Sequence, residues 1–577
     1  MRKLLLIFTF IIFSSCQYDD LKSQIDELSH EIIALQEITD VLELKILINN
    51  AYQTELLIIE LIELEDSIIL VFVDGTSYEV SNNIIIGYQI EGDNWLLNLT
   101  LTDTTVISTY IVGDELNISE HILNPFEISP LTSIINIETP ISGRFISRVV
   151  GQDGLKSDMI ITSEYYGTNH SLNIYGLYPN YENQIELTFV NNEGVEIITI
   201  FESIITDILP PGMPDLNVIS HYDEYNQNTM ILFNYRPTHI PFMADPLGKI
   251  RWYLNESVPK YALQRFKNGN FGYGKSGLNQ GSIFEFTIMG EYIQEYSFYP
   301  QFENAHHDVY EMSNENFLVA VNKVGIETIE DHILEIDRES GQIINIWDLR
   351  EILQIDRFTL VKIGDGSDWF HTNAVIHDES DNTLIISGQA QGTVKVTWGN
   401  QLKWILSPHD GWDSEYQDYL LQPTTGNEFE YSWGQHAPLI LPNGNLMQFD
   451  NGFGREFGNA SSDYSRIVEY EINENVNNVG GTVSQIWQYG KERGENMFSP
   501  FLSDVDYLED TSTMFINCGT TAFDIEYVSN LEQIFTPNIG QIETLIIEVN
   551  SSKEVLFEMA LSSNANGSTY RAEKLIL

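Results

Sequence analysis

Hydrophobic residues change their spacing along the chain, from helical steps near the N-terminus to alternation further on. Between Asp19 and Asn49 apolar side chains recur at alternating steps of four and three, the heptad pattern of a coiled-coil helix. The positions are Leu21, Ile25, Leu28, Ile32, Leu35 and Leu42, with Thr39 in the remaining slot. We predict a helical stalk over residues 17–49. A single amphipathic helix packed on its own chain is the alternative.

Short alternating runs replace the helical pattern from Ser67 onward. Ile68 to Val73 is apolar and precedes Asp74-Gly75, a hairpin turn signal. We therefore predict a small β-rich spacer over residues 50–125. Residues 126–207 contain further short strands, separated by turns at intervals typical of an immunoglobulin-like β-sandwich. These runs are Ile134–Ile137, Arg144–Val150, Ser171–Ile174 and Gln184–Phe189.

The chain repeats from about Ser220 to its end. One unit is a turn followed by a hydrophobic strand, and a second unit is a turn followed by an alternating strand with an aromatic or long apolar residue. The second unit has six copies, which begin at Gly248, Gly290, Gln342, Gln401, Thr482 and Glu554. Six repeats of four short strands predict a six-bladed β-propeller over residues 215–577. The expected fold class is therefore mostly β.

Three histidines occupy equivalent places in this repeat. His307, His371 and His436 each lie about ten to thirteen residues before the core of a returning strand. Radial repetition brings equivalent positions to one central channel, so we expect the three imidazoles to converge. His306 is the neighbour of His307, and adjacent strand residues face opposite sides, so only one of the two is expected to enter the channel. His307 is preferred because its spacing to Phe317 equals that from His436 to Leu446.

Three imidazoles in one channel are compatible with two kinds of chemistry. Three histidines can hold zinc and leave a position open for water. Alternatively, one histidine is a nucleophile and the others donate hydrogen bonds to developing charge without a metal. No acidic ligand accompanies all three histidines, and His307-Asp308 comes closest. Other polar residues near these strands are Asn373, Gln389, Gln435, Asn451 and Arg455.

The first residues have the pattern of an export signal. Met1-Arg2-Lys3 is basic, Leu4 to Phe13 is almost entirely apolar, and Ser14-Ser15-Cys16 follows. The arrangement resembles a bacterial lipoprotein signal, which implies cleavage before Cys16 and acylation of that residue. The chain would then be lipid-anchored in the bacterial cell envelope, at the outer membrane. An ordinary cleaved signal with an incidental cysteine is the alternative.

Charge restricts the partners of the chain. Its 84 acidic and 28 basic residues give a formal net charge of −56. Such a charge disfavours binding of nucleic acid or anionic lipid through a general basic surface, and an anionic substrate would need a locally positive pocket. The stalk permits a homo-oligomer without requiring one.

Long ordered stretches resemble the bacterial periplasmic arylsulfate sulfotransferases of the PAPS-independent type. The similarity spans roughly residues 240–577, and residues 126–207 resemble that family's N-terminal domain. Matching stretches include Asp331–Ile336, Ile346–Leu349, His371–Asn373, Lys403–Pro408, Gln435-His436, Phe449–Gly452, Tyr464–Tyr470 and Trp487–Gly494.

The resemblance implies a ping-pong transfer of a sulfuryl group from a phenolic sulfate ester to a phenol, with no cofactor and no metal. His436 would be the nucleophile that becomes sulfohistidine. His371 and His307 would donate hydrogen bonds to the sulfuryl oxygens or serve as acid and base, and Asn373 would help to hold the bound group. A neutral imidazole is a competent nucleophile near neutral pH.

The sequence departs from the family pattern at two site positions. Gln389 occupies the place of an active-site arginine, and Leu502 occupies the place of a threonine. The loss of a guanidinium could cost about 1.5–3 kcal/mol of charge-assisted bonding, and Arg455 is the candidate to replace its charge. Thr424–Asn427 stands where the family has a cysteine pair. The alternative functions are a ligand-binding propeller without transfer chemistry, an aryl sulfatase-like hydrolase, and a metal-dependent enzyme.

Overall fold

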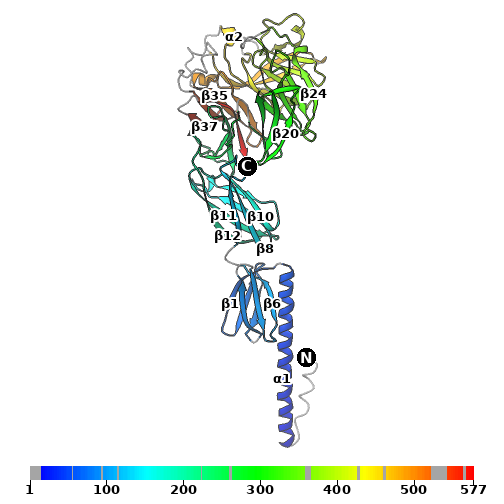
Figure 1. The fold of residues 1–577 in the computed structure, drawn as a ribbon, viewed down its shortest axis with the longest axis vertical. Helices are drawn as coiled ribbons and strands as arrows, with labels where there is room; N and C mark the ends of the chain where they lie inside the picture. Colours follow the sequence, from blue (N-terminus) through cyan, green and yellow to red (C-terminus); the bar gives the residue numbers. More distant parts are fainter. Residues whose placement is uncertain are drawn as a thin grey trace.

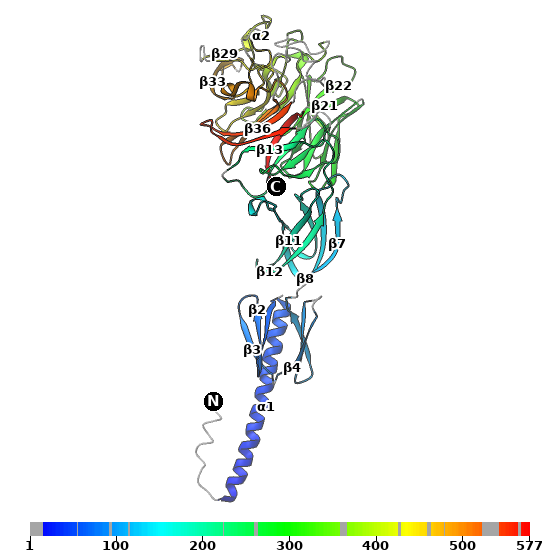
Figure 2. The ribbon, with the colours of Figure 1, turned by 90° about the vertical axis from the view of Figure 1, so that its left-hand side faces the viewer.

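The computed structural model is an elongated molecule built mostly from β-strands, with one long helix at its N-terminal end (Figures 1 and 2). It describes residues 15–54, 56–82, 84–91, 95–112, 116–222, 224–258, 263–277, 279–357, 366–424, 429–458, 463–477, 479–521, 542–562 and 567–577. The predicted signal segment up to residue 14, the side chain of Cys16 and the loop residues Thr425, Gly426 and Asn427 lie outside this description.

The predicted stalk is a single helix, α1 (Ser15–Gln53), which is slightly longer than expected. Its last three turns pack on the chain's own sheets, where Leu44, Ile48 and Ala51 are buried. The N-terminal part of α1 projects beyond these sheets (Figure 1). Among the described residues, no helix is both long enough and apolar enough to cross a membrane.

Two three-stranded antiparallel sheets form the spacer against which α1 packs. They are β1 (Ile58–Glu63), β2 (Ser67–Phe72) and β3 (Ser77–Ser81), and β4 (Ile85–Glu91), β5 (Leu96–Leu101) and β6 (Val106–Tyr110). The next strand, β7 (Asn117–Leu123), falls within the predicted spacer but pairs with β8 of the following sheet. The predicted boundary at residue 125 is therefore late, because the pairing partner of β7 lies beyond it.

The immunoglobulin-like part is organised around one long strand, β8 (Thr132–Val149). The N-terminal half of β8 pairs with β7 and β10, and its C-terminal half pairs with β9 and β11. The sequence predicted two separate strands here, but the alternation of buried side chains continues through the intervening residues. The other strands are β9 (Met159–Thr162), β10 (Gly167–Tyr175), β11 (Glu182–Asn191) and β12 (Glu196–Ile205).

Six sheets make up the remainder of the described chain. The first three, with strands in spatial order, are β16 (Ile250–Tyr253), β15 (Phe242–Ala244), β14 (Thr229–Tyr235) and β38 (Thr569–Ile576); β17 (Gln264–Arg265), β18 (Phe271–Gly277), β19 (Gln280–Phe286) and β20 (Tyr292–Ser297); and β21 (Phe302–Glu311), β22 (Phe317–Lys323), β23 (His332–Ile336) and β24 (Ile343–Asp348).

The other three sheets follow the same antiparallel order, with one added parallel strand, β29. They are β25 (Thr372–Asp378), β26 (Thr383–Gly388), β27 (Gly392–Thr397) and β28 (Leu402–Leu406); β30 (His436–Ile440), β31 (Leu446–Asp450), β32 (Arg466–Glu474), β33 (Gly481–Tyr489) and β29 (Leu421–Pro423); and β34 (Asp504–Leu508), β35 (Thr513–Thr521), β36 (Glu543–Asn550), β37 (Val555–Ser562) and β13 (Asp215–Ser220). Short helical segments are α2 (Arg455–Gly458), η3 (Leu155–Ser157), η4 (Leu349–Glu351), η5 (Gln417–Tyr419) and η7 (Lys491–Met497).

Each of the six predicted copies of the second repeat unit lies in a different one of these sheets, in β16, β20, β24, β28, β33 and β37. The edge strands β21, β25, β30, β34 and β38 contact one another in that order. The last strand of the chain, β38, completes the first sheet by pairing with β14. The strand content of the repeats is thus as predicted, whereas closure into a six-bladed propeller stays a prediction.

Candidate active site

Three neighbouring edge strands bring the predicted histidines together. His307 lies within β21, His371 immediately precedes β25, and His436 begins β30. Strand β25 contacts both β21 and β30. The ring centroids of His307 and His371 are 4.9 Å apart, and both imidazoles lie close enough to His436 to act on its protonation through their charge. The convergence expected from spacing alone is therefore present.

Backbone irregularities give these strands their shape at the site. The strand pairing shifts register beside His307, after Thr372 and after His436, as at β-bulges. His307, His371 and Ala437 have φ values of 59°, 54° and 47°, a left-handed region that non-glycine residues rarely adopt. Such bulges redirect side chains from the regular alternation of a strand.

The bulge in β21 changes one expectation. Adjacent side chains were expected to face opposite sides, but His306 and His307 both reach the carboxylate of Glu330. His306 also contacts the Oδ1 of Asn322 through its Nε2, at 2.8 Å. His307 stacks on the ring of Tyr570, with centroids 5.5 Å apart and an interplanar angle of 17°. His307 is thus the one that packs toward His371, as preferred from its spacing.

His436 is held as a neutral imidazole with a defined tautomer. Its Nδ1 lies 2.8 Å from the Oδ1 of Asn451 and 3.0 Å from the carbonyl oxygen of Gly434, so Nδ1 carries the proton and donates it to these acceptors. Burial lowers the pKa of His436 to about 3, with the neighbouring histidines acting in the same direction. Among the described residues none hydrogen-bonds Nε2, whose lone pair remains available.

The partner of His436 is itself fixed. The side-chain amide of Asn451 donates to the carbonyl oxygens of Ser499, at 2.8 Å, and Leu502, at 2.9 Å. Because both amide protons are used, Oδ1 faces the imidazole. Leu502, one of the two departures from the family pattern, therefore contributes its backbone oxygen to the support of His436.

His371 is held in the opposite state. Its Nδ1 lies 2.5 Å from the Oδ2 of Asp368 and 3.1 Å from the Oε2 of Glu330. Burial opposes protonation, but the charge of Glu330 and the hydrogen bond to Asp368 outweigh it and raise the pKa of His371 to about 9. His371 is consequently a cation at neutral pH, with Nε2–H left to donate.

Glu330 links three imidazoles and was missed in the sequence. Its oxygens lie 2.9 Å from His306, 3.3 Å from His307 and 3.1 Å from His371. Burial alone would raise its pKa, but the three histidines hold the pKa well below its usual range. Burial lowers the pKa of His307, so the positive charge beside Glu330 is not shared equally. Its position just before the family-like stretch Asp331–Ile336 was the available signal.

Asn373 and Gln389 both follow His371 in the sequence, Asn373 in β25 and Gln389 directly after β26. The side-chain amide of Asn373 donates to the carbonyl oxygen of Gln435 at 2.6 Å, and the backbone carbonyl oxygen of Asn373 accepts from the hydroxyl of Tyr570 at 3.2 Å. Asn373 therefore braces β25 against the residue before His436. Gln389 donates its backbone N–H to the carbonyl oxygen of His371, at 3.0 Å, and its side chain is buried.

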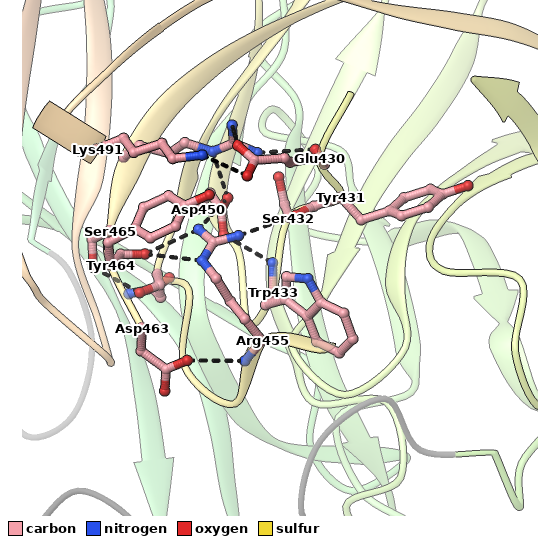
Figure 3. A network of polar contacts seen from close by, with 12 residues as sticks. Glu430, Tyr431, Ser432, Trp433, Asp450, Arg455, Asp463, Tyr464, Ser465 and Lys491 are labelled. Carbon is pink, nitrogen blue, oxygen red and sulfur yellow. Dashed lines mark hydrogen bonds and ion pairs between the residues drawn. The ribbon is translucent and has the colours of Figure 1, made fainter. Parts of the chain in front are cut away.

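Arg455 is committed to other contacts (Figure 3). Its guanidinium lies 2.7 Å from the Oδ2 of Asp450 and donates to the carbonyl oxygens of Tyr464 and Tyr431. Asp450 in turn accepts the backbone N–H of Trp433 at 2.9 Å. Arg455 thus stabilises the turn that leads into β30, and its role in binding substrate stays a prediction.

Two overlapping groups in this site have ligand atoms close enough together to hold a metal ion. They are His306, His307 and Glu330, and Glu330, Asp368 and His371. In both groups the histidine nitrogens lie at hydrogen-bonding distance from carboxylate oxygens. His436 belongs to neither group among the described residues.

Comparison with known proteins gives the family. The family model described as arylsulfotransferase (ASST) matches residues 215–571, and the arylsulfotransferase Ig-like domain matches residues 120–203. The chain belongs to the arylsulfotransferase family. The arylsulfotransferase match includes all three histidines of the site, together with Glu330 and Asp368.

Two curated relatives are each 26% identical to this arylsulfotransferase over 565 residues. They are the arylsulfate sulfotransferases AssT of Escherichia coli O6:H1 (strain CFT073) and of Lelliottia amnigena, and each alignment covers 78% of this chain and 91% of the relative. Among solved structures, a protein of unknown function from Bacteroides caccae matches with a TM-score of 0.38 at 12% identity, over 60% of this chain and 99% of that chain. That similarity is too low to define the fold.

Proposed function

We propose that this arylsulfotransferase moves a sulfuryl group from a phenolic sulfate ester to a phenol through a covalent intermediate on His436. The observation that best supports this proposal is the tautomer and protonation state of the His436 side chain. Its proton is held on Nδ1 by Asn451, its pKa of about 3 keeps it neutral, and Nε2 has an available lone pair. This is the form of imidazole that attacks an electrophile.

The first half-reaction forms one bond and breaks one. The Nε2 lone pair attacks the ester sulfur, an N–S bond forms, and the bond between sulfur and the aryl oxygen breaks with its electron pair on the phenolate. The phenolate takes a proton and leaves as a phenol. In the second half-reaction the oxygen of another phenol attacks the sulfur and loses its proton, and the N–S electron pair returns to Nε2.

His371 and His307 have different roles in this scheme. The His371 cation supplies a proton to the departing phenolate, or a hydrogen bond to a sulfuryl oxygen, through Nε2–H. The lowered pKa of His307 keeps its imidazole neutral, and a neutral imidazole can accept the proton of the incoming phenol. Asn373 positions the His436 strand, and Gln389 offers an uncharged donor where the family has an arginine. The protonated His371 supplies the positive charge that Gln389 lacks.

We also propose that the six sheets close into a six-bladed β-propeller with the site in its channel. Supporting this arrangement, the edge strands contact in series from β21 to β38, and β38 pairs with β14 of the first sheet. We also keep, as a proposal, the predicted division of the chain into stalk, spacer, sandwich and propeller. The boundary between spacer and sandwich moves to before β7, because β7 pairs with β8.

The N-terminal pattern supports a location in the bacterial cell envelope. We propose that Cys16 is acylated and anchors the protein at the outer membrane, with α1 holding the sheets away from the lipid. Metabolic labelling with a radioactive fatty acid tests this, with Cys16→Ser as the comparison. Label on the wild-type chain and none on the variant is expected, and an unlabelled wild-type chain would contradict it.

Intact mass after brief exposure to 4-nitrophenyl sulfate tests the covalent step. A gain of about 80 Da, the mass of SO3, is expected for the wild-type protein and not for His436→Ala. Continued release of nitrophenol, beyond one equivalent per enzyme and in the absence of any phenol acceptor, would identify a hydrolase. No adduct and no nitrophenol from several aryl sulfates would leave the second candidate, a ligand-binding member of the family, which Gln389 and Leu502 favour.

A further inference from the structure

Helix α1 carries a hydrophobic stripe that the described part of its own chain leaves uncovered. The exposed fractions of the stripe residues range from 42% to 63%, and these residues are Ile25, Leu28, Ile32, Leu35, Leu42 and Ile46. Scattered exposed apolar residues are ordinary, but a continuous stripe of large aliphatic side chains indicates a contact surface.

This stripe is separate from the face that α1 buries in its own chain. Leu44, Ile48 and Ala51 pack on the spacer. Two residues along a helix correspond to a rotation of about 200°, so Leu42 and Ile46 face away from Leu44 and Ile48. The helix therefore has two apolar faces, one satisfied by the chain itself and one open along its whole length.

The identity of the stripe residues indicates the kind of contact. With Ile25 at an a position, isoleucine recurs at a (25, 32 and 46) and leucine at d (28, 35 and 42). β-branched residues at a with leucine at d favour a parallel coiled coil of two strands. Thr39 occupies the remaining a position, and a single polar residue there restricts the register.

The flanking positions permit two identical helices to pair. In a parallel dimer, each g residue faces the e residue five positions later on the other helix. These pairs are Gln24 with Ser29, Glu31 with Gln36, and Ile38 with Glu43, and none brings like charges together. In a chain with a net charge of −56, this lack of repulsion along the seam favours a second copy as the occupant.

An anionic lipid surface fits the stripe less well. The side chains around it include Asp26, Glu27, Glu31, Glu37 and Asp40, which such a surface would repel. Lys45 is already paired with Asp103 at 2.6 Å.

We propose that two copies of this chain join through α1 as a parallel, in-register, two-stranded coiled coil. The contact runs from Ile25 to Ile46 and leaves the Leu44 face on the spacer of each copy. Two sets of sheets then stand side by side on a common stalk. The proposal does not depend on the transfer chemistry, because no residue of the active site takes part.

Disulfide trapping of the full chain in detergent tests register and direction together. In a parallel pair, residue 28 of one copy lies opposite residue 28 of the other, within reach of a disulfide, whereas residue 30 faces outward. On mild oxidation, Leu28→Cys is expected to run as a covalent dimer and the matched control His30→Cys as a monomer. Equal cross-linking of both variants, or of neither, would overturn the arrangement. The native Cys518 is fully buried, and the unchanged chain, oxidised in parallel, gives the background from the native Cys16.

Sedimentation of the same detergent-solubilised full chain measures the number of copies. The wild-type protein is expected at twice the chain mass. Leu28→Glu combined with Leu35→Glu is expected to halve it, with circular dichroism of the sheets unchanged. Ser23→Glu with Ala34→Glu adds the same charge outside the seam and should remain dimeric. A wild-type monomer would overturn the proposal, and a trimer would overturn its two-stranded form.

Discussion

The shared carboxylate of Glu330 gives the sharpest test of how the site works. Its Oε2 lies 3.1 Å from the Nδ1 of His371, whose pKa it helps to raise to about 9. Glu330→Gln keeps the size of the side chain and removes the charge. A charge-assisted hydrogen bond contributes about 1.5–3 kcal/mol, which corresponds to about one to two pKa units. The pKa of His371 should fall to about 7–8 in the variant.

The direction of the change in the pH profile follows from the protonation state in which each histidine takes part in the reaction. In the proposed mechanism His371 acts as a cation, so activity should be lost as the pH rises through its pKa, whereas His436 acts as a neutral nucleophile above a pKa of about 3. The alkaline limb of kcat/KM should therefore move toward neutral pH by about one to two units in Glu330→Gln. The acid limb should stay in place.

The assay compares two donors over the full pH range. Phenyl sulfate has a poor leaving group and depends on acid assistance, whereas 4-nitrophenolate leaves with little help. Glu330→Gln should consequently slow phenyl sulfate more than 4-nitrophenyl sulfate above pH 7. Glu303→Gln, the same change on β21 away from the histidines, should leave both profiles unchanged. An alkaline limb that does not move, with both donors slowed equally, would refute the reasoning and leave Glu330 a structural role.

Three further changes test other parts of the site. Asn451→Ala removes the hydrogen bond that fixes the tautomer of the His436 ring. Loss of this hydrogen bond should lower kcat/KM about 10- to 100-fold, measured by nitrophenol release. An unchanged rate would contradict the tautomer assignment. Gln389→Arg restores a cation beside the sulfuryl group and should raise kcat/KM up to about tenfold; a lower value with intact folding would show that the pocket has adapted to Gln389. Arg466→Met removes one of the two guanidinium groups that bind the buried Asp450, the other being that of Arg455, and should cost about 1.5–3 kcal/mol in thermal unfolding. Lys491→Met at the exposed rim should cost less than about 1 kcal/mol.

The repetitive part of the fold was predictable because its signals are local. Turn residues followed by alternating apolar residues identify a strand wherever they occur, and the six copies of the second repeat unit all form strands in separate sheets. Pairing partners are a non-local property. The alternation of apolar residues could not predict that β7 pairs with the sandwich or that β8 is one long strand. Both features depend on which strand edges are available for pairing.

The site was predictable to the same extent. The three histidines were found because they recur at equivalent places in a repeat. Glu330 and Tyr570 come from segments with no fixed spacing to those histidines, so the repeat could not connect them to the site, and only the family-like stretch after Glu330 pointed to that residue. Arg455 shows the converse limit. Arg455 lies near the site strands in the sequence, but its guanidinium forms an ion pair with the buried carboxylate of Asp450. Sequence proximity could not reveal this pairing.

Strand β38 makes the histidine site depend on a contact between distant parts of the sequence. β38 supplies the edge of the first sheet by pairing with β14, and its residue Tyr570 stacks on His307. β14 and β38, from opposite ends of the repeat region, must therefore pair before Tyr570 can pack against the histidine cluster. The three site histidines all precede β38 in the sequence, but His307 has its stacking partner Tyr570 only when β38 is in place. Because contacts between residues far apart in the sequence form slowly, completion of the site is expected to be a late step in folding.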